Sequence, residues 1–479
     1  MRTRIRLLFL VLSTVALFVS CDDTDSFAPA GNRTLTFEEE QIDLGTIFSG
    51  MPSATKDLWV YNKTGEGIIC SEIRLAQGNQ TGFRVNVDGW YLGPESGYRV
   101  QDVRIASGDS IRLFVEVTSY PTGRTTPQEI SDYLIFTLDG GGTQRLQLSA
   151  QTIDAVEFGN YDIQTNTTFA STQPVLVKKT ITVAENATLT IEAGTTLYFA
   201  NDAGIDVYGT LICEGTASDN VVLRGDRIDN MFDYLPYDRV AGQWKGLHFF
   251  ESSVGNRLTY TDIHSTYNGI VIDKPTQEGL HLLCEQVTVH NCQGYGVLSH
   301  GATINLVNTQ ITNTLNDCLL ADGGSVQINA STLAQFYPFD GNRGAALRFT
   351  NENEDLTQMV CENSLVTGYA DDVVMGNRAD NGKAFNYHFA NSLLRTENPS
   401  EAEQGNFIDC TFEDISAEEE GGQYNFLLFD TENLEYDFSL AKGSLAIGLG
   451  LKATMPVIDR KGNSRDDSPD VGAYEYIEE

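Results

Sequence analysis

The sequence LLCEQVTVHNCQGYGVLSHGATINLVNTQITNTLNDCLLADGGSVQINASTL, residues 282–333, contains a short pattern that recurs at nearly constant spacing. In each occurrence two adjacent polar residues precede an aliphatic residue, as in Glu285-Gln286-Val287, Thr309-Gln310-Ile311 and Ser331-Thr332-Leu333. The aliphatic residues follow one another after 24 and 22 residues. Self-similarity at a fixed period in the twenties is typical of a solenoid built from stacked coils.

The pattern continues on both sides of this stretch, with intervals of 24, 24, 22, 32 and 28 residues between its aliphatic positions. A second series of apolar residues, most of them following Gly or Asp, lies between the members of the first. Because the two interleaved series have similar periods, one repeat must carry at least two strands. The first series is Ile263, Val287, Ile311, Leu333, Leu365 and Leu393, and the second is Leu247, Ile270, Val297, Leu319, Ala346 and Val373.

The segments between these positions favour strands over helices, because they are rich in Thr, Asn and Val and contain no recurring Leu-x-x-Leu-x-Leu frame. We therefore predict an all-β fold in which residues 156–479 form a parallel β-helix. Each coil would be one turn, with its aliphatic residues pointing inward and stacking on the coils above and below. The longer intervals indicate corner loops, and a further insertion is expected between Arg224 and Trp244.

Residues 34–155 have a different character, with short alternating segments broken by Gly, Asn, Asp and Pro. This spacing predicts an antiparallel β-sandwich. The stretches Asp43-Leu44-Gly45, Trp59-Val60-Tyr61-Asn62 and Phe114-Val115-Glu116-Val117 resemble the immunoglobulin-like modules that precede repeat domains in secreted bacterial proteins. The predicted strands are residues 42–47, 56–61, 82–87, 110–117, 133–138 and 144–150.

Residues 1–20 read as a signal peptide, with three arginines before an apolar run that is too short to span a bilayer comfortably. The run ends in Phe18-Val19-Ser20-Cys21, which resembles the lipobox of bacterial lipoproteins and makes Cys21 the expected lipidation site. The acidic residues just after it resemble the surface-export signal of lipoproteins in the Bacteroides group. We therefore expect residues 21–33 to be a tether and the protein to be lipid-anchored at the outer membrane, exposed on the cell surface. The alternative is a plain secretory signal with an incidental cysteine.

The charge balance excludes a conventional nucleic-acid surface, because 31 basic residues stand against 66 acidic ones, giving a net charge of −35 over 479 residues. Removal of residues 1–20 takes away three arginines and no acid, which changes the net charge to −38. Acidic lipid headgroups would repel that surface, so membrane attachment must come from acyl chains, such as palmitate, on Cys21. The seven remaining cysteines show no CxxC spacing and predict neither a disulfide framework nor a zinc site.

Several stretches in the second part of the chain resemble a known family. Residues 182–197, 209–212 and 242–247 are similar to the right-handed parallel β-helix repeat proteins of Bacteroides-type bacteria. The ending, about residues 436–479, contains Gly443-Ser444-Leu445-Ala446-Ile447-Gly448 and Asp470-Val471-Gly472-Ala473-Tyr474 and resembles the so-called choice-of-anchor Q segment of β-helix surface proteins. The resemblance implies a pectin-lyase-like fold, but the family has no single activity, so it implies no chemistry.

No catalytic constellation stands out in the sequence, and we assign no catalytic residue, no metal ligand and no cofactor. A polysaccharide lyase on this fold would need Ca²⁺ held by carboxylates, and a glycoside hydrolase would need two or three carboxylates around the bond. Asp371-Asp372 and Ser299-His300-Gly301 resemble polygalacturonase elements only in part, because their order along the chain is reversed. The six histidines all fall in the repeat region and are interpreted as stacked surface residues.

Aromatic residues gather in and just after the predicted insertion, and aromatic faces stack on sugar rings. They are Phe232, Tyr234, Tyr237 and Trp244. These four are candidate ligand-binding residues. The alternative is that Trp244 packs at the start of a coil while the others cover an open face.

Three classes of function follow from these observations. The first is a non-catalytic envelope lipoprotein whose β-helix is a binding or scaffold module for glycan or for a host or envelope protein. The second is a Ca²⁺-dependent polysaccharide lyase or another glycan-active enzyme that uses the groove of the β-helix. The third is a purely structural envelope component. The missing catalytic signatures favour the first.

Overall fold

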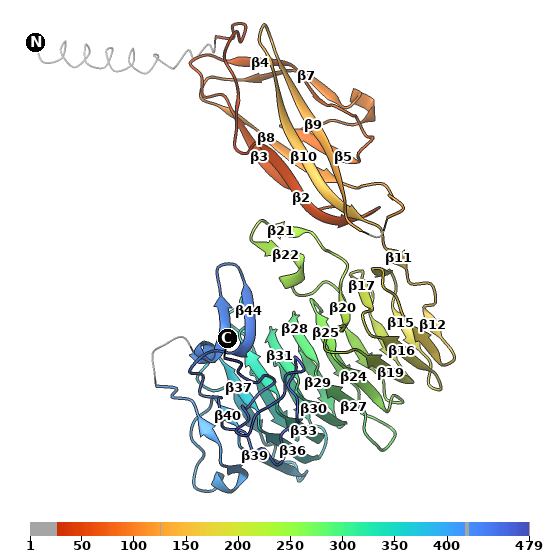
Figure 1. Ribbon diagram of the computed structural model, residues 1–479, viewed down its shortest axis with the longest axis vertical. Coiled ribbons are helices and arrows are strands. Elements are labelled where there is room, and N and C mark those ends of the chain that lie inside the picture. The colour runs from red at the N-terminus through yellow and green to blue at the C-terminus, as the bar shows by residue number, and fades with distance from the viewer. Residues whose placement is uncertain (1–25, 125, 417–420, 479) are drawn as a thin grey trace, which may run out of the picture. The chain divides into compact units, whose positions relative to one another are not determined.

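The computed structural model describes residues 26–124, 126–416 and 421–478, so the predicted signal peptide and Cys21 lie outside the described residues. The chain divides into two compact units, Met1–Ile153 and Asp154–Glu479. Nearly all regular structure is β (Figure 1). Within the described ranges, no helix is both long and apolar enough to cross a membrane.

The first unit contains two five-stranded sheets around one hydrophobic core, as in a β-sandwich. Inward residues alternate with outward ones along each strand, as in Phe83–Val87, because successive side chains of a strand point to opposite faces. One sheet contains β1 (Thr36–Phe37), β3 (Lys56–Tyr61), β8 (Ser110–Val117), β5 (Phe83–Val87) and β6 (Trp90–Tyr91). The other contains β2 (Gln41–Phe48), β10 (Thr143–Ile153), β9 (Gln128–Leu138), β4 (Ile68–Leu75) and β7 (Arg99–Ile105), and the 3₁₀ helix η1 is Pro94–Ser96.

The prediction of a wholly antiparallel sandwich is wrong at one edge, where β2 pairs in parallel with β10. About a hundred residues separate the two strands, so no hairpin forces them to be antiparallel. A register shift between Ser149 and Gln151, opposite Gly45 with φ +70°, marks the irregular pairing. Strands β4 and β7, which were not predicted, lie side by side in the same sheet.

The second unit is dominated by three sheets in which every neighbouring pair of strands is parallel, and each coil up to Ala390 gives one strand to each sheet (Figure 1). These long parallel sheets agree with the parallel β-helix expected from the repeats. The first parallel sheet contains β11 (Val156–Glu157), β14 (Val175–Val177), β17 (Thr196–Phe199), β20 (Val221–Gly225), β25 (Thr261–His264), β28 (Thr288–Cys292), β31 (Gln310–Thr314), β34 (Thr332–Gln335), β37 (Leu365–Gly368), β40 (Leu393–Leu394) and β42 (Thr411–Phe412).

The other two parallel sheets complete the coils. The second parallel sheet contains β12 (Asp162–Ile163), β15 (Ile181–Val183), β18 (Ile205–Val207), β23 (Leu247–Phe249), β26 (Ile270–Ile272), β29 (Val297–His300), β32 (Leu319–Asp322), β35 (Leu347–Thr350) and β38 (Val374–Asn377). The third contains β13 (Thr167–Phe169), β16 (Thr188–Glu192), β19 (Thr210–Glu214), β24 (Asn256–Thr259), β27 (Leu282–Glu285), β30 (Thr303–Val307), β33 (Gly324–Asn329), β36 (Leu356–Glu362), β39 (Phe385–Ala390) and β41 (Phe407–Ile408).

In the described part of this unit, two antiparallel hairpins and three short 3₁₀ helices lie outside the coils. The insertion predicted after Arg224 contains β21 (Asn230–Phe232), β22 (Leu235–Pro236) and η2 (Tyr237–Arg239). Later in the chain come η3 (Gln404–Asn406), η4 (Gly421–Asn425) and the hairpin β43 (Phe426–Asp430) and β44 (Glu435–Leu440).

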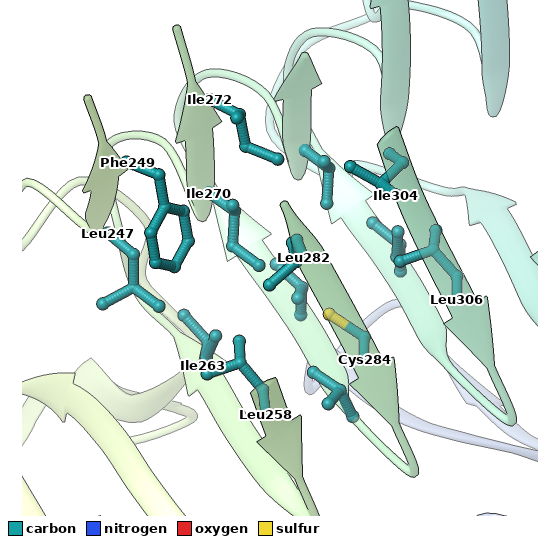
Figure 2. Close-up of a cluster of buried hydrophobic side chains, with 14 of the residues drawn as sticks. Leu247, Phe249, Leu258, Ile263, Ile270, Ile272, Leu282, Cys284, Ile304 and Leu306 are labelled. Carbon is teal, nitrogen blue, oxygen red and sulfur yellow. The ribbon is translucent and has the colours of Figure 1, made fainter. Parts of the chain in front are cut away.

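Aliphatic side chains from all three sheets fill the interior of the coils, and Figure 2 shows part of this stack. Ile263 on β25, Leu247 on β23 and Cys284 on β27 point into it with side chains almost fully buried. Six described cysteines are buried and all seven are free, and burial raises the pKa of Cys213 to about 12. This confirms the interpretation of most cysteines as small buried apolar residues.

The tight corner between the third and first sheets explains the polar residues of the repeat. A residue with φ between +42° and +56° stands there in successive coils: Tyr260, Gln286, Asn308, Ala330, Asn363, Asn391 and Asp409. Hydroxyl groups then join the coils, because the backbone N–H groups of Thr309, Ser331 and Ser364 donate to the next coil's Ser331, Ser364 and Ser392 at 3.0–3.1 Å. The corner therefore has its own polar ladder.

This corner also corrects the predicted register. Ile263 is paired with Val289, not Val287, because Gln286 takes the left-handed conformation and Val287 is buried at the corner before β28 begins. In later coils Leu333 pairs with Val366 rather than Leu365. In the second series Leu347 and Val374 replace Ala346 and Val373, whereas the pairing of Leu247, Ile270, Val297 and Leu319 is as predicted.

The C-terminal segment covers part of the outer face of the first parallel sheet. Phe426, Phe438, Ala446 and Val471 form a second buried cluster of this unit with Leu365 and other outward residues. The Ala473 N–H donates to Thr332 Oγ1 at 2.9 Å, and Tyr474 donates its hydroxyl to Gln310 at 2.5 Å. The outer face of this sheet is therefore a buried surface over these coils.

Candidate functional site

The four aromatic residues singled out in the sequence do not form one surface. Phe232 and Tyr234 are 55% and 51% exposed and stack on each other, with ring centroids 5.8 Å apart. Tyr237 is half-buried under the guanidinium of Arg227, which lies 4.1 Å from its ring centroid. Trp244 is 1% exposed and stacks on Phe199 inside the coils, so its ring offers no face to a ligand at the surface.

The partial polygalacturonase-like elements have structural contacts. Asp372 accepts a hydrogen bond from the Val374 N–H at 3.2 Å, at the start of β38, and Asp371 lies 3.4 Å from the Arg395 guanidinium. Ser299 is fully buried on β29 and His300 lies 3.5 Å from Asp322. These contacts place Asp371-Asp372 at the corner before β38.

A cluster of histidines and carboxylates lies on the outer face of β25 and β28, and the interpretation of the histidines as surface residues is wrong for His264, which is buried. Asp262 and His264 flank the inward-facing Ile263, and His290 is the register partner of His264 in the next coil. His264 Nδ1 is 2.6 Å from Asp262 Oδ1, and His290 Nε2 is 3.4 Å from the same oxygen. We call Asp238, Asp262, His264 and His290 the histidine cluster.

The inserted loop completes this cluster from the other side. Asp238, in η2, contacts His264 Nε2 at 2.8 Å and is itself paired with Arg224 at 2.6 Å. Burial alone would lower the pKa of His264, but the two carboxylates outweigh it and raise that pKa to about 9. For Asp262 burial acts in the opposite direction and would raise the pKa, but the two nearby imidazoles hold this pKa well below its usual range.

A groove of about 270 Å³ gives solvent a path to the cluster. His290 and Asp238 line it on one side, and the hairpin β43–β44 lines it on another through residues such as Glu435 and Tyr436. Arg239 ties the inserted loop to this hairpin, donating to the Asn433 carbonyl at 2.6 Å and pairing with Glu435 at 3.4 Å.

A larger hollow, of about 750 Å³, lies where the second parallel sheet ends at β38 while its two neighbours continue. Because no further strand of that sheet follows, aromatic residues of the third sheet and the end of the core are left only partly covered. They are Phe385, Tyr387 and Phe407, and Phe385 packs on the buried Phe349 of β35 with ring centroids 5.6 Å apart. The loop 396–406 passes over them, and Tyr387 donates its hydroxyl to Glu403 at 3.5 Å. We call this site the aromatic hollow.

Polar side chains line the rest of the aromatic hollow. Asn377, Arg378, Asn398 and Glu403 lie around it and are exposed. Aromatic rings with amide, guanidinium and carboxylate groups around them can stack on the C–H faces of a sugar and hydrogen-bond its hydroxyls. The sequence carried a signal for the aromatic part, the alternation Phe385-Asn386-Tyr387-His388-Phe389, but none for the loop that completes the hollow.

Comparison with known proteins adds no family. A scan against family profiles and a search of curated proteins both find no match. Among solved structures, this chain is similar to the ASH/PapD-like domain 7 of human CEP192, with TM-score 0.17 and 15% identity over 28% of this chain and 96% of that one. It is also similar to a family 123 glycoside hydrolase from Clostridium perfringens, with TM-score 0.18 and 8% identity over 30% of each chain. Similarities this low carry no argument about function.

Proposed function

We propose that this protein is a lipid-anchored envelope protein whose right-handed β-helix binds a glycan in the aromatic hollow without cleaving it. In this proposal Cys21 carries the acyl chains that attach the protein to the outer membrane, with the chain exposed on the cell surface. An immunoglobulin-like sandwich precedes the coils, and the choice-of-anchor Q-like ending packs on them. The observation that carries the proposal is the partly covered aromatic group with a polar surround at the end of the second parallel sheet.

The charge of the chain limits the type of glycan. At −38 after removal of residues 1–20, the protein repels polyuronates and other acidic polymers at moderate ionic strength. Arg378 is accompanied by Glu397 and Glu403 around the hollow, so the hollow itself is not basic. A neutral polysaccharide is therefore the ligand class that fits this site.

The test is a binding screen of the detergent-purified full-length protein against neutral and acidic polysaccharides. We expect retention by at least one neutral glycan, with about tenfold weaker binding for Tyr387→Ala and for the exposed rim variant Arg378→Ala. The matched control is the double variant Phe232→Ala/Tyr234→Ala, which removes an exposed aromatic pair elsewhere and should leave binding unchanged.

Other outcomes distinguish the alternatives. If glycan binding is lost only in the Phe232→Ala/Tyr234→Ala variant, the binding site lies on the inserted loop and not in the aromatic hollow. Release of unsaturated uronides in a Ca²⁺-dependent way would show a lyase and overturn the proposal. Absence of any glycan binding, with correct folding, would leave a structural envelope role.

A further inference from the structure

The histidine cluster has the donor set and the spacing of a metal site. One donor atom each from Asp262, His264 and His290 lies within 4.8 Å of the others. Two imidazole nitrogens and one carboxylate suit Zn²⁺ and similar transition metals, whereas Ca²⁺ and Mg²⁺ prefer oxygen ligands alone. The donors come from β25 and β28, which are neighbouring strands inside a long parallel sheet, so their spacing is set by the fold.

The spacing of the ligand atoms requires only a small adjustment. Zinc takes ligand atoms at about 2.0–2.2 Å, which places them a little over 3 Å apart in a tetrahedron. His290 Nε2 and Asp262 Oδ1 are 3.4 Å apart, and His264 Nδ1 and Asp262 Oδ1 are 2.6 Å apart. Side-chain rotations that open the second contact by less than about 1 Å and bring the two imidazole nitrogens, which lie within 4.8 Å of each other, to a similar spacing would therefore admit the ion.

The second ring nitrogen of His264 supplies an independent observation. It contacts Asp238 at 2.8 Å, and Asp238 is held in turn by Arg224 at 2.6 Å. A metal-bound histidine almost always donates its other N–H to a carboxylate or carbonyl, which fixes the ring and its tautomer. Asp238 is placed to take that role while Asp262 binds the ion.

The groove beside His290 provides an entry path and room for a further ligand. Its lining includes Gln310, Thr312 and Asn313 as well as His290 and Asp238. Three protein ligands with solvent access leave a fourth position for water, as at zinc sites that remain open to small ligands.

We propose that Asp262, His264 and His290 bind a zinc-class divalent metal ion, with Asp238 orienting His264. The site lies on the outer face of the first parallel sheet and is independent of glycan binding in the aromatic hollow. An experiment that contradicts the metal site therefore leaves the glycan-binding proposal untouched, and the reverse also holds.

The experiment titrates Zn²⁺ into untagged, chelator-treated full-length protein in detergent, in competition with a zinc-sensitive dye. We expect one ion per chain with a dissociation constant of about 1 µM or tighter. His290→Ala should weaken binding by more than about 100-fold, and Asp238→Asn, which keeps all three ligands, by about tenfold. The control His388→Ala replaces a half-buried strand histidine outside the cluster and should bind like the parent chain.

Cobalt provides a second readout, because bound Co²⁺ in a four-coordinate site has intense visible absorption that a hexaaqua ion lacks. Circular dichroism of each variant separates loss of ligands from loss of fold, and Asp238→Asn keeps the test valid if His290→Ala does not fold. Equal zinc affinity in His290→Ala and the parent chain would overturn the proposal. So would the absence of one-to-one binding tighter than about 100 µM.

Discussion

The two faces of the first parallel sheet differ in their side chains. On β25, β28 and β31 the inward residues Ile263, Val289 and Ile311 form one aliphatic column, buried in every coil. The outward residues of the same strands change from coil to coil and include Asp262, His264 and His290. The inner face packs only against the equivalent inward positions of other strands, so it stays aliphatic, whereas the outer face meets an insertion, a hairpin and the C-terminal segment, so it varies. Specific chemistry therefore collects on the outer face.

The largest effect is expected where the outer face holds a buried charge. Glu475 and Arg465 are paired at 3.2 Å with side chains 4% and 2% exposed, and Glu475 also accepts the N–H groups of Asp466 and Asp470. Glu475→Ala leaves Arg465 buried without its partner and should destabilise the protein by about 4 kcal/mol, measured by urea unfolding. Limited proteolysis should show the C-terminal segment released first.

An exposed ion pair in the same segment is the control. Lys452 pairs with Asp467, whose side chain is almost fully exposed, so Asp467→Ala should leave the free energy of unfolding almost unchanged. Equal effects of the Asp467 and Glu475 substitutions would contradict the idea that the outer face is a buried polar interface.

The inner face should respond to loss of volume alone. Ile263→Ala removes a fully buried side chain from the stack in Figure 2 and should cost about 3 kcal/mol in urea unfolding. Val271→Ala is the matched control on β26, because Val271 lies between two inward residues and points outward. Its expected cost is below about 1 kcal/mol, and a cost as large as that of Ile263→Ala would mean that the assignment of faces is wrong.

The polar ladder at the corner between the third and first sheets lies between the two faces. Its loss should destabilise the protein by an intermediate amount. Ser364→Ala removes the acceptor of the buried Ser331 N–H, 3.1 Å away, and leaves that donor unpaired. We expect a loss of about 1.5 kcal/mol in the free energy of unfolding. Ser325→Ala, on the outward side of β33, is the control and should have almost no effect; a neutral Ser364→Ala would mean that the hydroxyl ladder contributes nothing to stacking.

The same contrast explains what could be predicted from the sequence. Leu247, Ile270, Val297 and Leu319 were placed in the correct register because each coil repeats the same inward position. The register failed at Val287 because an apolar residue stands directly after the left-handed Gln286, whereas the inward position is the third residue after it, Val289, just as Ile311 is the third after Asn308.

The candidate sites were harder to predict because non-repeating segments complete them. Asp262 and His264 lie two residues apart, and His290 follows 26 residues after His264, but only the true register brings the histidines together. Asp238 joins them because the inserted loop docks there, which depends on contacts such as Arg239 with the Asn433 carbonyl. Trp244 shows the converse, since an aromatic residue at a coil start has the same sequence signature whether it is exposed or stacked in the core.

The smallest expected effect concerns Asp226 at the start of the inserted loop, where a carboxylate is partly buried at a cost in stability. Burial raises the pKa of Asp226 to about 6, above its value in an unfolded chain, so the folded state favours the protonated acid. The charged form destabilises the fold fully above pH 6, and this penalty disappears as the pH falls through 6 towards 4. Asp226→Asn should therefore raise stability at pH 7.5 by about 1 kcal/mol, because partial exposure reduces the full effect of such a shift. The difference between variant and parent in urea unfolding should shrink to zero near pH 4. If the stability difference between variant and parent does not vary with pH, Asp226 acts through its contacts and not through its charge. The burial of its carboxylate would then not destabilise the fold.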